Sequence, residues 1–239
     1  MLDAQIAKAK TIASHKVPLI FVGVAMHSQS TAFQADAHTT QAALGKLVSA
    51  PFPSIILSNN FERKRLTYPF ATTDSISRAI QAASEMGDAE TPVVILLTTH
   101  GTYEALALAI GFKDYPLVRT DEMMRWLTPL GDRPVILIIS ACHAGSLVPG
   151  LITENRAIYF AAAAHRASFG CDVTSTNTYF VEELFGRHLD SNASLNDLML
   201  AAEQRIAARE KKEKLTPSLP GSDAGVHMDK WVQRPLRQW

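Results

Sequence analysis

Four short runs of apolar residues constrain the fold of this chain more than any other feature of its sequence. They cover residues 17–25, 54–58, 92–99 and 134–140, and a weaker fifth run covers residues 157–164. The runs are rich in valine and isoleucine and do not alternate with polar residues. Strands that are covered on both faces have this pattern, because neither face of the sheet meets water. The runs therefore predict the strands of a parallel sheet.

Helical segments lie between most of these runs. We expect helices over residues 34–48, 120–127, 178–189 and 194–212, the last of them capped by Ser194. A further helix should begin at a cap, Thr73 or Asp74, and end at Gly87. Because strand and helix alternate, we expect an α/β fold with helices on both faces of a mostly parallel sheet of about six strands.

The domain organisation is simple. The 239 residues suffice for one sizeable domain, and no internal repeat, low-complexity tract or interdomain linker divides them. The tail that begins at Leu215 is rich in proline and glycine, and residues 226–232 could add an edge strand. We therefore predict a single domain over residues 1–239.

Charge and composition exclude several classes of protein. Lysine and arginine total 23, as do aspartate and glutamate, and no basic run is dense enough to follow a nucleic acid backbone. The longest apolar runs have the length of a strand, so we expect no membrane span. The start of the sequence lacks the pattern of a signal peptide, and two cysteines fit a reducing compartment. We expect a cytoplasmic protein, or a periplasmic or membrane-tethered one if the natural N-terminus is longer.

Two polar motifs follow directly after two of the predicted strands. His100 and Gly101 come after residues 92–99, and Cys142 comes after residues 134–140. Ligands of open parallel sheets bind beyond the carboxyl ends of the strands. If these two strands are neighbours, about 4.8 Å apart, an imidazole and a thiol reach the same substrate carbonyl. This pattern favours a nucleophilic thiol assisted by a histidine.

A chemical role would explain why a glycine follows the histidine. A backbone N–H approaches a substrate oxygen closely only where no side chain intervenes, so Gly101 and the N–H of Cys142 could form an oxyanion hole. The alternative is structural, because cysteines at strand ends commonly serve packing and single histidines are commonly surface residues. The paired arrangement favours the catalytic interpretation.

The sequence resembles the legumain-like cysteine peptidases (peptidase family C13), in particular their bacterial members. This family shares its fold with caspases, gingipains and the transamidase that attaches lipid anchors. The resemblance extends over essentially the whole domain. The motifs that carry it are Gln34-Ala35-Asp36, Thr98-Thr99-His100-Gly101, Ser140-Ala141-Cys142-His143-Ala144-Gly145, residues 161–171 with Thr178-Tyr179-Phe180, and Leu215-Thr216-Pro217-Ser218. It implies a caspase-like three-layer α/β/α sandwich and a thiol peptidase that forms a thioester acyl-enzyme.

The resemblance also implies which residues act and where this chain departs from the family. His100 and Cys142 correspond to the catalytic dyad. The arginine of the family's asparagine pocket is replaced by Ala32 and one pocket acid by Ser140, while Glu182 matches a second acid in charge. The asparagine that orients the histidine falls at Ser30. Asparagine specificity therefore does not carry over, and a basic or small polar substrate side chain is conceivable.

Further residues near the motifs have open roles. We interpret Cys171 as a buried thiol near the pocket and His143 as a residue that points away from Cys142 at the edge of the site, with a charge that could lower the thiol pKa. Ser168, like its neighbour His165, either contacts substrate or belongs to a surface loop. His27 and His38 could border the cleft, but a surface role is favoured.

The predicted function is that of a cysteine endopeptidase acting on peptides or proteins, with no cofactor. A zinc site built from His100, Cys142, His143 and Cys171 has suitable ligand types but no standard spacing, and a metal would quench the nucleophile. Two alternatives use the same residues: a transpeptidase or amide ligase, and a caspase-like module that binds peptide without catalysis. The sequence leaves the oligomeric state open.

Overall fold

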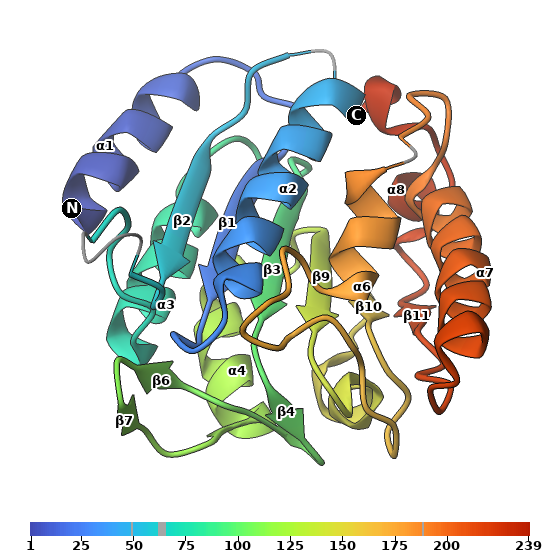
Figure 1. Ribbon diagram of the computed structural model, residues 1–239. Coiled ribbons are helices and arrows are strands. Elements are labelled where there is room, and N and C mark those ends of the chain that lie inside the picture. Colours follow the sequence, from blue (N-terminus) through green and yellow to red (C-terminus); the bar gives the residue numbers. More distant parts are fainter. Residues whose placement is uncertain (49, 62–65, 188) are drawn as a thin grey trace.

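A six-stranded sheet forms the centre of the molecule (Figure 1). The computed structural model describes residues 1–48, 50–61, 66–187 and 189–239. In spatial order the strands are β11 (Gly221–Ala224), β10 (Arg156–Phe160), β9 (Val135–Ser140), β3 (Val93–Thr98), β1 (Ile20–Ala25) and β2 (Ser54–Ser58). Five of them are parallel and only β11 is antiparallel. The predicted mostly parallel sheet of about six strands is confirmed.

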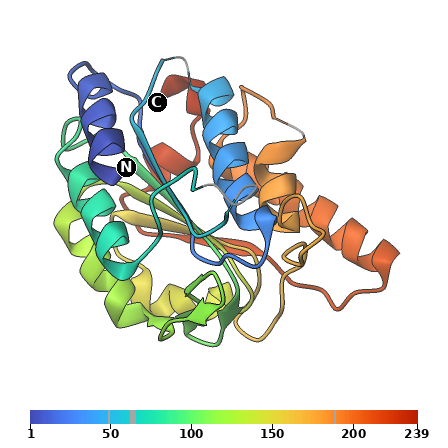
Figure 2. The same cartoon turned by 60° about the vertical axis from the view of Figure 1, so that its left-hand side comes forward.

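Helices cover both faces of the sheet, so the fold has three layers (Figure 2). One face packs against α1 (Leu2–Ile12), α3 (Thr73–Ser84), α4 (Thr120–Leu127) and α5 (Val148–Leu151). The other packs against α2 (Thr31–Leu47), α6 (Tyr179–Val181), α7 (Leu195–Glu213) and α8 (Asp229–Val232). The chain also has three 3-10 turns and one π-helical segment in the described ranges: η1 (Thr128–Leu130), η2 (Ala144–Leu147), η3 (Glu182–Gly186, π) and η4 (Leu236–Gln238).

The continuous apolar runs are explained by two cores. In β9, Leu137 and Ile139 pack into the core on the α3 side, whereas Ile136 and Ile138 pack into the core on the α7 side. All four side chains are inaccessible to solvent. Successive side chains of a strand point to opposite faces, so a strand that is buried on both faces must be apolar at every position.

Short strands follow β3 at the carboxyl edge of the sheet, at the bottom of Figure 1. They form a three-stranded sheet of β4 (Gly101–Thr102), β5 (Ala105–Leu106) and β8 (Val118–Arg119), and a hairpin of β6 (Ala109–Ile110) and β7 (Lys113–Asp114). Neither these strands nor α1 were predicted, because the strands are only two residues long and α1 has a weak amphipathic pattern.

Several predicted boundaries need correction. The predicted edge strand at residues 226–232 is wrong: Trp231 and Val232 lie in α8 and pack into the core, and the edge strand is β11. The predicted helix over residues 178–189 is only the short α6 followed by the π-helical segment, and position 188 lies outside the described residues. The cap of α3 is Thr72, which forms a capping box with Ser75. Ser194 caps α7 as predicted.

None of the helices in the described part of the chain is long and apolar enough to cross a membrane.

Candidate active site

Three neighbouring strands deliver polar side chains to one edge of the sheet. The last residues of β1, β3 and β9 pair with one another across the sheet. His27, His100 and Cys142 each lie two residues beyond these paired positions. The hydrogen-bond ladder continues one residue further, since Met26 N–H donates to the Thr98 carbonyl at 3.0 Å and Thr99 N–H to that of Ser140 at 3.1 Å. The register therefore brings the three side chains to the same edge.

Gly101 lies directly against the backbone of Cys142. A Cβ atom at position 101 would overlap the carbonyl oxygen of Cys142 and would lie 3.1 Å from the Cβ of Ala141. The carbonyl of His100 accepts a hydrogen bond from Ala107 N–H at 2.9 Å, which fixes the chain on the other side of the glycine. Only glycine allows the two strand ends to approach this closely.

The Cys142 thiol lies in a surrounding that favours its ionised form. The loop after β10 returns over Cys142, and Ser168 N–H donates to its Sγ at 3.3 Å. A hydrogen bond from Cys171 lowers the pKa of Cys142, with further contributions from the Ser168 backbone and hydroxyl and from the charge of His143, whereas burial opposes the shift. The same hydrogen bond, together with burial, raises the pKa of Cys171. The opposite shifts make Cys142 the more acidic thiol of the pair.

The His100 imidazole is packed between two aromatic rings. Its ring centroid lies 4.7 Å from that of His27 and 5.1 Å from that of Phe33, both in edge-to-face geometry. Burial lowers the pKa of His100, while the nearby Cys142 charge raises it. The surface role expected for His27 is wrong, because its side chain is only 6% exposed.

A buried carboxylate connects the elements behind the site. Asp36 of α2 accepts hydrogen bonds from the Thr98 hydroxyl (2.8 Å), from Asn177 Nδ2 (3.0 Å), and from both the N–H and the hydroxyl of Thr178 (3.0 and 2.8 Å). The Thr178 hydroxyl lies 2.8 Å from that of Ser140. Complete burial raises the pKa of Asp36 to about 7, although the hydrogen bonds from Asn177, Thr98 and Thr178 oppose the shift.

Asp36 therefore ties the ends of the two central strands to the segment before α6. In the sequence, this residue stands out only as part of the motif of residues 34–36. Its position among the apolar residues of a helix could have identified it. An acidic side chain on the buried face of a helix must be surrounded by hydrogen-bond donors, so it indicates a polar contact inside the protein.

Three residues expected near the substrate are fully covered. Ser140 and Ala32 have no exposed surface, and Ser30 is 1% exposed. The Ser30 hydroxyl accepts from Ala32 N–H at 3.2 Å, which caps α2, and donates to the carbonyl of Asp172 at 2.8 Å. Ser30 thus anchors the loop that carries Cys171, while its proposed contact with His100 stays a prediction.

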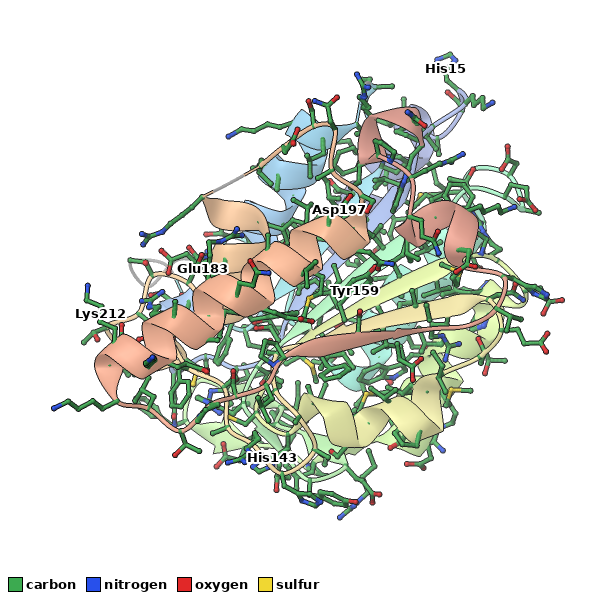
Figure 3. The ribbon with its side chains drawn as sticks, turned by 90° about the vertical axis from the view of Figure 1, so that its right-hand side faces the viewer. His15, His143, Tyr159, Glu183, Asp197 and Lys212 are labelled. Carbon is green, nitrogen blue, oxygen red and sulfur yellow. The ribbon has the colours of Figure 1, made fainter. Side chains whose placement is uncertain are left out.

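Glu182 belongs to an ion-pair cluster between η3 and α7. Its carboxylate binds Arg187 and Arg209, the latter at 2.8 Å. The adjacent Glu183 binds Arg205 at 2.9 Å, and Figure 3 shows it beside α7. Burial raises the pKa of Glu182, but the hydrogen bonds from Arg209 and Arg187 outweigh it and the net shift is downward. The charge of Glu182 is therefore already neutralised within the protein.

The remaining histidines of the site region lie at its border. Nδ1 of His143 lies 3.1 Å from the carbonyl oxygen of Ala164, and Figure 3 shows this residue apart from α7. The ring of His165 stacks on that of Tyr103 with centroids 5.0 Å apart. In the described part of the chain, no three or more His, Cys, Asp or Glu side chains are grouped so that they could hold a metal ion.

Comparisons with known proteins are consistent with this architecture. A sequence profile described as the Peptidase C13 family matches residues 79–224. Caspase-1 from Spodoptera frugiperda has a similar structure, with a TM-score of 0.59 and 16% identity over 88% of this chain and 87% of that chain. A structure of pro-sf-caspase-1 gives a TM-score of 0.62 and 16% identity over 88% and 92% of the two chains. Curated protein sequences give no significant match. The predicted caspase-like fold is confirmed.

Proposed function

Because this chain belongs to the peptidase C13 family, we propose that it is a cysteine endopeptidase with Cys142 as nucleophile and His100 as its proton-transfer partner. The observation that carries the proposal is the placement of both side chains two residues beyond paired positions of adjacent strands. The lowered pKa of Cys142 supports it, because the thiolate is the reactive form of a cysteine.

The reaction follows from these two groups. The Cys142 thiolate attacks the carbonyl carbon of a peptide bond, and the electron pair of the C=O bond moves to the oxygen. When the C–N bond breaks, the leaving amine takes a proton from the His100 imidazolium, and a thioester remains. Water then attacks the thioester and gives a proton to neutral His100, and the C–S bond breaks to release the carboxylic acid and restore the thiolate.

The negative oxygen needs hydrogen-bond donors. We propose the backbone N–H groups of Gly101 and Cys142, because Gly101 lies directly against the backbone of Cys142. Donors that are already in place when charge develops lower the barrier without reorganisation. A side chain at position 101 would separate the strands, so the glycine serves both packing and chemistry.

The proposed mechanism predicts how kcat/KM depends on pH. One proton must be shared by Cys142 and His100, since a doubly protonated pair has no nucleophile and a fully deprotonated pair has no acid. The pKa values of both groups are lowered from their ordinary values, that of Cys142 chiefly by Cys171 and that of His100 by burial. The profile of kcat/KM against pH should therefore be a bell whose two limbs both lie at lower pH than for free cysteine and histidine.

The substrate side chain before the cut is proposed to be small and uncharged. No arginine stands at the Ala32 position, and Ser140 is engaged with Thr178. Glu182, the acid that could attract a basic side chain, is neutralised by Arg187 and Arg209. The contacts of Glu182 thus favour the small polar option over the basic one.

A peptide library tests the proposal. The residue before the cleaved bond is varied, and turnover is compared between the wild type, Cys142→Ala and the matched control Cys171→Ala. We expect cleavage by the wild type, none by Cys142→Ala and residual cleavage by Cys171→Ala. Turnover that survives in Cys142→Ala would contradict the thiol mechanism, and peptide binding without turnover in the wild type would contradict the assignment as a peptidase.

A further inference from the structure

We propose that His27 is a positioning residue for His100: its ring packs against the His100 imidazole, fixes the orientation of that imidazole and keeps water from it. This inference rests on the proposed function, because it concerns the histidine that transfers protons there. It is carried by the strand register, by the ring contacts and by the hydrogen bond that His27 accepts.

The backbone of His27 is held from two sides. The preceding residue, Met26, donates to Thr98 of β3 and accepts from Ala109 N–H at 3.0 Å. His27 itself forms a parallel bridge with Ala109 at the start of the β6–β7 hairpin. The side chain is 6% exposed. Since β1 and β3 are hydrogen-bonded neighbours, this fixed backbone places His27 beside His100.

Three rings then form a cluster around the imidazole. The rings of His27 and His100 are nearly perpendicular, at 83°, and those of Phe33 and His100 are at 88°. His27 and Phe33 also contact each other, with centroids 6.2 Å apart. Edge-to-face packing of this kind restricts ring rotation and excludes solvent. Removal of one ring of the cluster would open a path for water to His100.

His27 must be uncharged to do this. Gln29 N–H donates to its Nδ1 at 3.3 Å, so the proton of the neutral ring resides on Nε2. Burial lowers the pKa of His27, the charge of His100 lowers it further, and Asp114 of β7 raises it. A neutral ring can lie against the imidazolium of His100 without repulsion. The charge that acts on His100 is that of Cys142, which raises the pKa of the imidazole.

A pair of substitutions separates the ring from the hydrogen bond. His27→Phe keeps a ring of similar shape but loses the acceptor for Gln29 N–H. His27→Asn keeps an acceptor at a similar place but loses the ring. If the ring positions His100, His27→Phe should retain kcat within about threefold, whereas His27→Asn should lose on the order of tenfold or more with little change in KM.

The pH profile distinguishes positioning from a general structural role. In His27→Asn water should reach His100, its pKa should rise, and the alkaline limb of the kcat/KM profile should move to higher pH. In His27→Phe the limb should stay in place. A loss of rate in His27→Asn without movement of the limb would overturn the proposal, as would an equal loss in both variants.

An NMR titration of the His100 imidazole provides a second test, which does not depend on turnover. Its signal is identified by its disappearance in His100→Asn, and its pKa is compared in the wild type, His27→Phe and His27→Asn. A higher pKa only in His27→Asn supports the proposal, and equal pKa values in all three overturn it. Absence of peptidase activity in the wild type would reject the proposed function, whereas this titration would still decide the role of His27.

Discussion

Two polar clusters of the molecule, similar in size, differ in how their charges are satisfied. In the η3–α7 cluster the acids have arginine partners: Glu182 binds Arg187 and Arg209, and Glu183 binds Arg205. In the strand-end cluster of His27, Phe33, His100, Cys142, Ser168 and Cys171, neither imidazole forms a salt bridge with an acidic side chain of the described residues, although the charges of Asp114 and His143 act on His27 and Cys142.

The difference indicates what each cluster does. The salt bridges lower the pKa of Glu182 and join η3 to α7, which is a structural role. Hydrogen bonds instead lower the pKa of the thiol, and burial lowers the pKa of both imidazoles, so that protons can be exchanged in a moderate pH range. Four predictions test this contrast, from the largest expected effect to the smallest.

Removal of His100 should have the largest effect. His100→Ala should lower kcat/KM on the order of a thousandfold, because proton transfer to the leaving amine is lost. The matched control is His143→Ala, which removes the imidazole next to the nucleophile and should cost less than about tenfold. Steady-state cleavage of the best peptide from the library measures both. Equal losses in the two variants would contradict the assignment of His100.

The buried carboxylate behind the site should make stability depend on pH. Its pKa is raised from 3.8 to about 7, so the folded protein is most stable where Asp36 is protonated and loses stability as pH rises toward about 7. Relative to Asp36→Asn, which cannot ionise, the free energy of unfolding of the wild type should fall by roughly 3 kcal/mol between about pH 4.5 and about pH 7.5. Urea unfolding of both proteins at both pH values measures this. A constant difference would show that Asp36 is ionised throughout.

The contact between the two cysteines should set the reactivity of the nucleophile. Cys171→Ala removes the hydrogen bond that contributes most to the lowered pKa of Cys142, so the pKa of Cys142 should rise. Cys171→Ser keeps a donor and should shift it less. The rate of Cys142 alkylation by iodoacetamide against pH, followed by mass spectrometry, gives the midpoint. The contact has no such role if the midpoint is the same in Cys171→Ala and in the wild type.

Neutralisation of an acid in the η3–α7 cluster should have the smallest effect. Glu182→Gln should lower the free energy of unfolding by about 1 kcal/mol, less at high salt, and leave kcat/KM within about twofold. Chemical unfolding and the peptide assay measure the two quantities. A selective loss of activity toward substrates with a basic side chain would show instead that Glu182 contacts substrate, and the contrast between the clusters would fail.

Local sequence patterns were sufficient to predict the central strands and the strand ends that carry the candidate catalytic residues. The runs that became β3 and β9 are apolar up to their last residues, Thr98 and Ser140, and His100 and Cys142 follow closely, so strand length and strand end could be read without knowledge of neighbours. The sequence did not predict elements that lack a hydrophobic pattern of their own. One example is β11, whose four residues Gly221–Ala224 form a strand only because the edge of β10 is open to pairing.

What the sequence by itself determined is therefore most of the sheet, most of its helical cover and the strand-end positions of two residues of the candidate site. The tertiary structure alone decided that β1 lies beside β3, which moves His27 from an expected surface position to the side of His100. It also decided that the loop after β10 returns Cys171 to Cys142, and that Glu182 is held by Arg209 of α7, a distant helix. The hydrophobic pattern of the sequence indicates whether a residue is buried. Which residues contact one another depends on strand order and loop paths, and these are set by the packing of the whole chain.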